Sequence, residues 1–324
     1  MKLIKLSIYL LVFLSCSGTS KEKKGPVEQE KSTAIINETS LVILGTVQDA
    51  GSPHIACKKE CCNTLFLNPD TNRKVVSLGL IDAENEKIYL FEATPDISEQ
   101  LKNLKRKAPF NANEIPNGIF ITHAHIGHYT GLMYLGKEAT NAKNAVVYAM
   151  PKLKAFIEAN GPWGQLVSNK NIALEEIHNN EEISLSPIIN VMPIRVPHRD
   201  EYSETVGFRI VGPNKSVLFI PDIDKWDKWK TSIVEVVTNV DYALIDATFF
   251  DAAEINNRDI SEIPHPFVIE TMELFKNHPE AIRNKIHFIH LNHTNPLLNL
   301  ESKQSKEVLA KGFHIARIND IIEL

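Results

Sequence analysis

Three histidines fall within six residues of this sequence, directly after a short apolar run. The run is Gly118–Thr122, and the histidines are His123, His125 and His128. In an extended chain, residues two apart project to the same side, so His123 and His125 can bind one ion together. Gly127 allows the chain to turn and bring the imidazole of His128 to the other side of the site. Because histidine is a common ligand of zinc, iron and copper, the spacing predicts a metal site rather than unrelated loop histidines.

Three other predicted strands end at residues that can bind a metal. The strands predicted over Val191–Val196, Ser216–Ile220 and Lys285–His290 are followed by, or end in, His198, Asp222 and His290. In α/β proteins, ligand sites gather at the carboxyl ends of strands, because the sheet is rigid and the loops converge there. Each residue alone could cap a turn or line the edge of the core. Together they complete the metal site that the first three histidines begin.

The cysteines indicate a second kind of metal site. After Cys16, the sequence contains only Cys57, Cys61 and Cys62. An odd number of cysteines, two of them adjacent, cannot form a clean set of disulfides within one chain. Three thiolates need one more ligand for a tetrahedral structural zinc, and we expect His293 to supply it. The alternatives are His54 as the fourth ligand, one disulfide with a spare thiol, or buried free thiols.

Short apolar runs alternate with helical patterns along the chain, which predicts sheet faces covered by helices. Further strands are predicted over Leu41–Thr46, Val75–Ile81, Lys87–Glu92, Gly118–Thr122, Ala145–Ala149, Val206–Val211 and Tyr242–Ile245. Helices are predicted over Ile97–Lys107, Gly131–Glu138, Lys152–Ala159, Lys225–Val237, Phe267–Lys276 and Ser302–Lys311. The content of 43% hydrophobic and 23% charged residues is that of a globular domain. A net charge of -5 leaves no basic excess, so we expect a small-molecule substrate and no nucleic-acid partner.

The run from His123 to His128 resembles the HxHxDH signature of the metallo-β-lactamase superfamily, and the other candidate ligands follow in that superfamily's order. The resemblance implies an α/β fold, the αββα four-layer sandwich, as one domain over residues 41–324. It also implies two neighbouring ions. The first would be held by His123, His125 and His198, and the second by His128, Asp222 and His290, with Asp222 able to bridge both.

One residue departs from this signature, because Gly127 stands where the superfamily has an aspartate. In most of the superfamily that aspartate is a further ligand of the second ion, and glycine has no side chain to replace it. The second site is therefore expected to lack a ligand and a negative charge. It would bind an ion weakly, use another ligand, or be empty. Asp49, which follows the first predicted strand, is expected to line the cleft or to close a turn.

Other stretches are similar to a narrower family, that of pyrroloquinoline quinone synthesis protein B. These stretches are Val42–Thr46 before the cysteines, Ala93–Ile97, Asp246–Phe250, and His290 followed by Asn295 and Pro296. The cysteine–histidine site is also similar to that of the cyclic phosphodiesterase of bacterial phosphonate breakdown. The quinone-synthesis family is degenerate in its first histidines, whereas His123 and His125 are present here. The resemblance therefore implies a relative that retains a metal-hydrolase site.

These resemblances imply metal-dependent hydrolysis of an ester or phosphodiester. One or two catalytic ions are expected to be zinc, with iron or manganese as alternatives, beside one structural zinc. An ion held by three histidines would lower the pKa of bound water toward neutrality and supply hydroxide. Asp222 or His265 would orient that water or transfer protons. The alternative functions are iron-dependent oxygen chemistry and metal or ligand binding without turnover in a lipoprotein.

The N-terminus carries an export pattern. Lys2 and Lys5 precede the apolar run Leu6–Leu14, and Ser15 precedes Cys16. This run is too short to span a bilayer, and its end resembles a bacterial lipoprotein signal over residues 1–16. Residues 17–40 are polar and lack apolar periodicity, as expected for a flexible tether. The sequence thus predicts an exported protein, in the periplasm or at the cell surface, whose only membrane contact is a lipid on Cys16.

Overall fold

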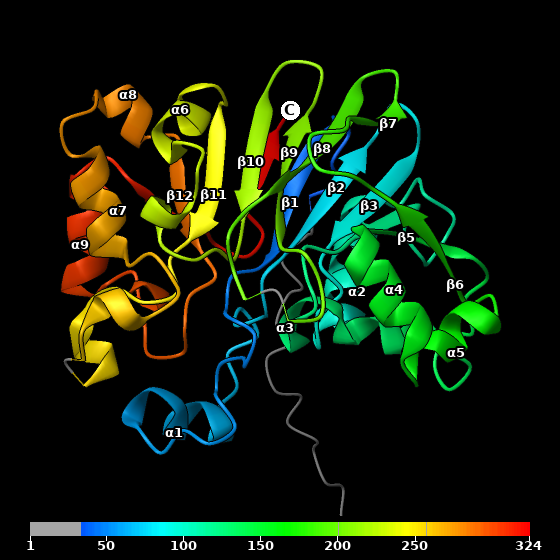
Figure 1. Ribbon diagram of the computed structural model, residues 1–324, viewed down its shortest axis with the longest axis horizontal. Helices are drawn as coiled ribbons and strands as arrows, with labels where there is room; N and C mark the ends of the chain where they lie inside the picture. The colour runs from blue at the N-terminus through cyan, green and yellow to red at the C-terminus, as the bar shows by residue number, and fades with distance from the viewer. Residues whose placement is uncertain (1–33, 200, 257) are drawn as a thin grey trace, which may run out of the picture. The chain divides into compact units, whose positions relative to one another are not determined.

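Two seven-stranded β-sheets lie face to face in the computed structural model, which describes residues 34–199, 201–256 and 258–324. Helices cover the outer face of each sheet, so the layers run helix, sheet, sheet, helix (Figure 1). This arrangement confirms the predicted αββα sandwich. Residues Ala34–Leu324 form one compact unit.

The first sheet is antiparallel on one side and parallel on the other. Its strand order is β14 (Ile321–Glu323), β1 (Ser40–Gly45), β2 (Ser77–Asp82), β3 (Lys87–Phe91), β4 (Gly118–Phe120), β5 (Ala145–Ala149) and β6 (Ile172–Glu176). From β14 to β3 the neighbours pair antiparallel. From β3 to β6 they pair parallel, so the carboxyl ends of β3 and β4 lie at the same edge.

The second sheet is likewise parallel on one side and antiparallel on the other. Its order is β13 (His314–Ile315), β12 (Ile286–Ile289), β11 (Tyr242–Asp246), β10 (Ser216–Ile220), β9 (Val206–Val211), β8 (Ile189–Arg195) and β7 (Ile183–Ser186). The neighbours from β13 to β10 are parallel, and those from β10 to β7 are antiparallel. The parallel β10, β11 and β12 therefore bring their carboxyl ends together.

Both faces of the central strands are apolar, because each strand contributes to two cores. On β1, Leu41 and Ile43 belong to the core between the sheets, whereas Val42 and Leu44 belong to the core beneath the helices. Alternate residues of a strand point to opposite faces, so a continuous apolar run suits a strand that is covered on both sides. These rigid strands form the frame that positions the site.

The helices divide between the two outer faces. The first sheet is covered by α2 (Ile97–Lys107), α4 (Pro151–Ala159) and α5 (Trp163–Ser168), and the second by α6 (Ile233–Thr238), α7 (Val268–Phe275) and α9 (Lys303–Ala310). The shorter helices are α1 (Glu60–Leu67), α3 (Ile126–Tyr129) and α8 (Glu280–Arg283). Short 3-10 helices lie at Thr130–Leu135, Trp226–Lys228, Ala252–Ile255, Ile260–Glu262 and Pro296–Leu298.

Two of the predicted α-helices are wrong, because each contains a 3-10 helix beside a shorter α-helix. The helix predicted over Gly131–Glu138 is instead the short α3 followed by a 3-10 helix. The helix predicted over Lys225–Val237 is a 3-10 helix followed by α6, which begins after Ser232, whose side chain accepts a hydrogen bond from the amide of Glu235. The sequence analysis also missed short elements, namely β6, β7, β13, β14, α1, α5 and α8.

The folded part of the chain begins earlier than residue 41. Ile36 is buried, and its amide donates to the carbonyl oxygen of Lys107 at 2.9 Å. Residues 34–40 therefore belong to the sandwich and not to the tether predicted over residues 17–40. The remainder of that tether and the lipoprotein signal at residues 1–16 lie outside the described residues. Within the described ranges, no helix is both long enough and apolar enough to cross a membrane.

Candidate metal centre

The candidate ligands lie where strands of both sheets end. His123 and His125 follow β4, His198 follows β8, Asp222 follows β10, and His290 follows β12. Residues at the ends of buried strands have little freedom, since the strands are fixed in the cores on both of their faces. The structure thus brings together side chains that come from four separate parts of the chain.

The first cluster consists of His123, His125, His198 and Asp222. The Oδ2 atom of Asp222 lies 3.4 Å from His123 Nε2 and 3.2 Å from His198 Nε2. Ligand atoms that are each about 2 Å from a tetrahedral ion lie about 3.3 Å apart, so these separations fit a bound cation. Both ring nitrogens of His198 are buried and make no hydrogen bond to any part of the chain that the structure describes. A bound cation would satisfy Nε2.

The second cluster consists of Asp49, His128, Asp222 and His290, whose ligand atoms all lie within 4.8 Å of one another. Asp49 Oδ1 is 2.8 Å from His128 Nε2 and 3.1 Å from His290 Nε2. Asp222 Oδ2 is 3.9 Å from His128 Nε2 and belongs to both clusters. The arrangement offers two neighbouring cation positions that share one carboxylate.

Asp49 fits one of the alternatives left open for the second position, namely a ligand other than the missing aspartate. From the sequence, Asp49 is expected only to line the cleft or to close a turn, but its carboxylate lies among the ligand nitrogens of this cluster. One signal could have found it. Asp49 follows the apolar strand β1 closely, just as the other candidate ligands follow their strands.

Three buried histidines of the two clusters, His123, His128 and His290, have the Nδ1 atom close to another side chain. These pairs are His123 with Thr122 Oγ1 at 2.9 Å, His290 with Thr248 Oγ1 at 2.9 Å, and His128 with Glu92 Oε1 at 3.3 Å. Partners of this kind orient a ligating imidazole and fix its tautomer. Glu92 and Thr248 were not singled out from the sequence, because their closeness to these rings depends on how the strands pack.

The charges within the clusters suit a cation. Burial disfavours the ionised form of Asp222, but the positive charges of His265, His198 and His290 outweigh it and hold its pKa well below the usual range. For Asp49, His128 and His290 outweigh burial in the same way and lower its pKa. Both carboxylates therefore remain ionised. Burial and the nearby His128 lower the pKa of His123, which keeps its ligand nitrogen unprotonated.

His265 lies beside the shared carboxylate and not merely at a helix entry. Its Nδ1 atom is 2.9 Å from Asp246 Oδ2 and 3.2 Å from Asp222 Oδ1. Asp246 is held in turn, because its Oδ1 accepts hydrogen bonds from the amide and the hydroxyl of Thr248. Burial lowers the pKa of His265, but Asp246 and Asp222 outweigh this effect and raise it to about 10. The two carboxylates therefore favour the protonated form of this imidazole.

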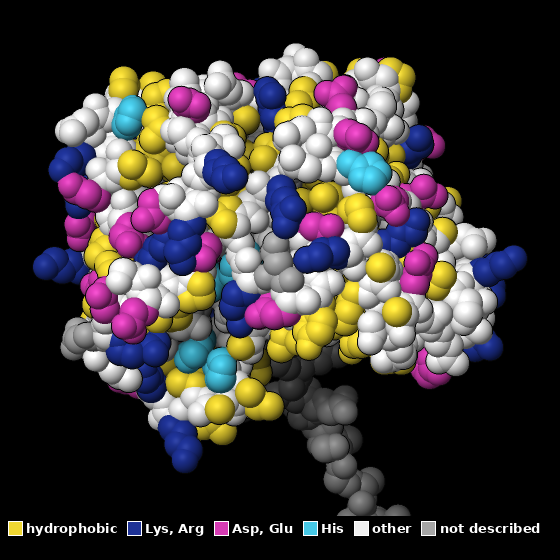
Figure 2. Space-filling model, in the orientation of Figure 1, with side chains coloured by type: hydrophobic (Ala, Val, Ile, Leu, Met, Phe, Trp, Pro, Cys, Tyr) yellow, Lys and Arg dark blue, Asp and Glu magenta, His cyan; other side chains and the backbone are white. Residues whose placement is uncertain are grey.

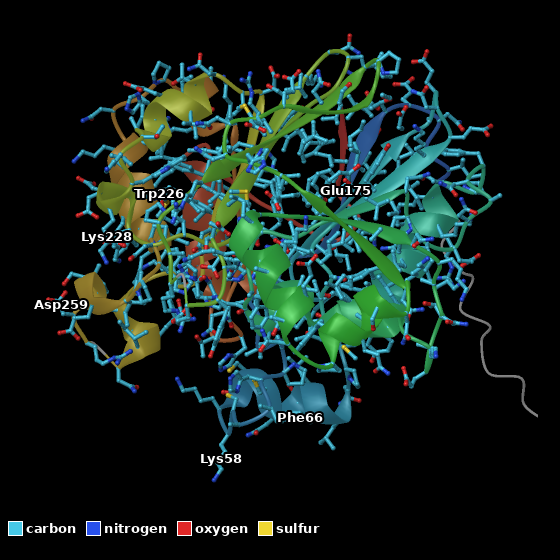
Figure 3. The ribbon with its side chains drawn as sticks, turned by 45° about the vertical axis from the view of Figure 1, so that its right-hand side comes forward. Lys58, Phe66, Glu175, Trp226, Lys228 and Asp259 are labelled. Carbon is cyan, nitrogen blue, oxygen red and sulfur yellow. The ribbon has the colours of Figure 1, made fainter. Side chains whose placement is uncertain are left out.

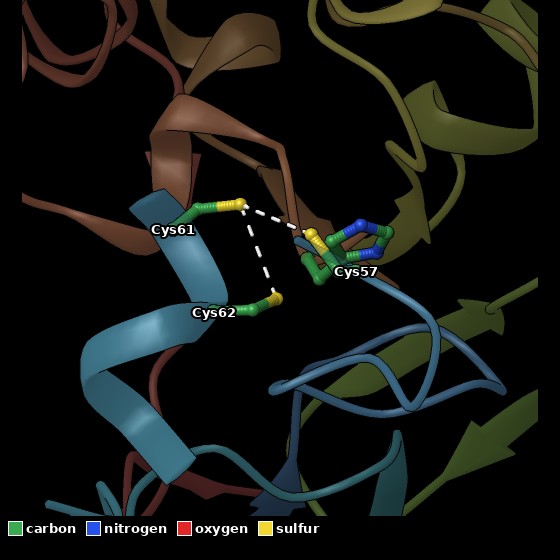
Figure 4. A group of neighbouring side chains, drawn as sticks. Cys57, Cys61 and Cys62 are labelled. Atoms are coloured by element: carbon green, nitrogen blue, oxygen red, sulfur yellow. Dashed lines mark hydrogen bonds between the residues drawn. The ribbon is translucent and has the colours of Figure 1, made fainter. Parts of the chain in front are cut away.

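The three cysteines and His293 form a separate cluster whose ligand atoms lie within 4.8 Å of one another. The Sγ atoms of Cys57 and Cys61 are 3.9 Å apart, and those of Cys61 and Cys62 are 4.0 Å apart (Figure 4). Thiolates that are about 2.3 Å from a tetrahedral zinc lie about 3.8 Å apart, so the spacing fits this ion. Burial, and then the neighbouring sulfur atoms, raise the pKa of Cys61 to about 12, as expected for crowded thiols without a cation.

His54, the alternative fourth ligand, lies outside this cluster. Its Nδ1 atom accepts a hydrogen bond from the amide of Ala56 at 3.2 Å. Its ring packs against that of His293, with 4.6 Å between the centroids. Helix α1, which carries Cys61 and Cys62, projects from the rest of the molecule (Figure 3).

A two-sheet sandwich with paired histidine–aspartate clusters at its strand ends defines a class of metal-binding α/β proteins. The sequence profile of the beta-lactamase superfamily domain matches residues 87–290. The chain therefore belongs to the metallo-β-lactamase superfamily, as its histidine signature predicts.

Relatives and solved structures give a consistent picture. Coenzyme PQQ synthesis protein B of Methylorubrum populi is 22% identical over 297 residues, covering 85% of this chain and 97% of that protein. The zinc-bound structure of PqqB from Methylobacterium extorquens has a TM-score of 0.70 at 21% identity, covering 88% of this chain and 100% of that one. A diphosphatase from the PhnP family has a TM-score of 0.61 at 19% identity, covering 89% and 97%. These structures share the fold of this chain.

Proposed function

We propose that this protein is a metal-dependent hydrolase of a phosphodiester or a related ester. The observation that carries the proposal is the carboxylate shared by two ligand clusters. Asp222 Oδ2 lies 3.2 Å from His198 Nε2 in one cluster and 3.9 Å from His128 Nε2 in the other. Paired divalent ions are typical of phosphatases and nucleases, in which they stabilise both the attacking and the leaving oxygen. The shared fold with the PhnP-family diphosphatase supports a substrate that carries a phosphoryl group.

The ligand atoms suit zinc, and also iron or manganese, because they are imidazole nitrogens and carboxylate oxygens. When bound, such ions would polarise the scissile group and lower the pKa of water. Asp222 would be a ligand common to both ions, since its side chain is buried and ionised and belongs to both clusters. Glu92, Thr122 and Thr248 would orient the ligand imidazoles through their Nδ1 atoms.

His265 would donate a proton to the leaving oxygen. Its Nδ1 atom faces the carboxylates of Asp246 and Asp222, so Nε2 is the ring nitrogen available for transfer. Asp246 would act as a positioning residue, because it holds the ring and stabilises the imidazolium. This role develops the expectation that His265 transfers protons, with Asp222 serving as metal ligand.

The surface supports a small substrate. On the face shown in Figure 2, positive and negative side chains are interspersed, without one large basic patch. A nucleic acid would favour a continuous basic stripe on the protein. A small ester needs only the metal centre and a few neighbouring side chains.

The test compares the zinc-loaded wild type with His265→Gln on phosphodiesters that differ in their leaving group. We expect kcat to fall by about 10²–10⁴-fold on a dialkyl phosphodiester, whose leaving group is an alcohol that must be protonated. The loss should be much smaller when p-nitrophenolate leaves, because this group needs little protonation. Zinc content should not change. The matched control is His178→Ala, which removes an exposed histidine that pairs with Glu176 outside the centre.

Two results would contradict the proposal. One is the absence of hydrolysis by the zinc- or manganese-loaded wild type across a panel of diesters and esters. The other is an equal loss of kcat for both leaving groups in His265→Gln. A second candidate, oxygen-dependent chemistry with iron, is favoured by the match to almost the whole length of coenzyme PQQ synthesis protein B. Oxygen uptake by the iron-loaded protein, with none by the zinc-loaded protein, would support that candidate instead.

A further inference from the structure

Gly127 is a glycine for reasons of space and not of backbone conformation. It lies within α3, and its φ angle is not positive, so any residue could adopt its conformation. A Cβ atom at this position would lie 2.4 Å from the Cα of Asp49, 2.8 Å from its Cβ and 2.9 Å from its Cγ. These separations are far below van der Waals contact. Asp49 therefore occupies the volume that a side chain at position 127 would need.

Backbone hydrogen bonds hold Asp49 in this place. The amide of Gln48 donates to the carbonyl oxygen of Leu291 at 3.0 Å, and the amide of Gly51 donates to that of Gln48 at 2.9 Å. The first bond ties the segment to the residue after His290, and the second closes a turn around Asp49. The position of the carboxylate is thus set by the framework and not by a long flexible side chain.

We propose that Asp49 is the carboxylate ligand of the second ion and takes the role that an aspartate at position 127 has in the HxHxDH signature. In this chain the carboxylate comes from the turn after β1 and not from the segment after β4. Glycine at position 127 leaves the room that Asp49 occupies. A side chain at position 127 would require the backbone at position 49 to shift. The match to the superfamily begins at residue 87, so this ligand lies outside it. The inference rests on the metal centre of the proposed function, but not on the reaction.

The geometry supports direct binding over a supporting role. Asp49 Oδ1 lies 2.8 Å and 3.1 Å from the Nε2 atoms of His128 and His290. These nitrogens are the metal-facing ones, because the Nδ1 atoms lie close to Glu92 and Thr248. A carboxylate that only oriented the rings would lie near Nδ1 instead.

The experiment measures zinc binding by the full chain after removal of metal, using calorimetry in a zinc buffer and elemental analysis. Asp49→Asn should weaken binding of the second catalytic ion by more than about 100-fold. The first catalytic position and the cysteine site should keep their zinc. Gly127→Ala should weaken binding of the same ion, because the added Cβ atom would displace Asp49. The matched control is Asp70→Ala, which removes an exposed carboxylate from the loop after α1.

Circular dichroism and melting curves establish that each variant is folded. The proposal is wrong if Asp49→Asn binds the second ion as tightly as the wild type. It is also wrong if Asp49→Asn loses zinc from the first position or from the cysteine site and not from the second position. These experiments measure bound zinc and not catalytic turnover. Their results would therefore stand even if the protein proved not to be a hydrolase.

Discussion

Replacing Cys61 with serine tests whether the cysteine cluster holds a structural zinc. Helix α1, which carries this residue, has eight residues, and only Cys62 among them is buried. A helix of fewer than about 12 residues is marginal without tertiary packing. Ile55 and Leu67 are 90% and 82% exposed, so they do not supply a core for this segment. We therefore expect the ion, held by three cysteines and His293, to be what orders α1.

The expected magnitude follows from linkage between binding and folding. An ion at a hundredfold excess over its Kd stabilises the folded state by about 2.7 kcal/mol. For a domain of this size, 1 kcal/mol shifts the Tm by about 2–4 °C, so Cys61→Ser should lower the Tm by about 5–10 °C. The variant should contain one zinc fewer per chain. The amides of α1 should lose their protection from hydrogen exchange, whereas the sheets keep theirs.

The assays are elemental analysis, calorimetric melting and hydrogen exchange on the zinc-loaded protein. His54→Ala is the matched control, because this histidine packs on His293 but lies outside the ligand group, and it should keep the ion. If Cys61→Ser kept both its zinc content and its Tm, the cluster would not be a metal site. If His54→Ala lost the ion and His293→Ala kept it, the fourth ligand would be misassigned.

Two further predictions concern the N-terminus and the second sheet. Cys16→Ala should move the protein from the membrane fraction to the soluble fraction, because a lipid on this cysteine is the expected anchor; retention in the membrane would contradict the lipoprotein signal. Burial, and then the charge of His314, lower the pKa of His287 to about 4, whereas the unfolded value is about 6.5. The folded state then binds fewer protons than the unfolded state, so this contribution to stability is complete above about pH 6.5 and is lost as the pH falls toward 4. Urea unfolding of the wild type and of His287→Asn should therefore show a difference in stability that shrinks by about 1–2 kcal/mol between pH 7 and pH 4, after allowance for partial exposure. A constant difference would show that the pKa of His287 is the same in the folded and unfolded states.

The sequence alone was sufficient to predict the sandwich and most of the candidate ligands. Apolar runs such as Val42–Leu44 and Val217–Ile220 are continuous because both faces of the central strands are covered. Each such run ends where the backbone must leave the sheet. A histidine or aspartate directly after the run therefore lies at a sheet edge, as His123 and Asp222 do.

The tertiary structure decided which side chains meet at that edge. Asp49 and His128 are 79 positions apart, and their contact exists because the segment after β1 pairs with Leu291. No local pattern encodes that pairing, so from the sequence Gly127 predicts a missing ligand, whereas the folded chain fills its place. Likewise, the apolar spacing after Gly131 is compatible with an α-helix, but a 3-10 helix forms there. Gly127 and Asp49 depend on one another in the folded chain, because the backbone and side chain of Asp49 fill the volume that a side chain at position 127 would need.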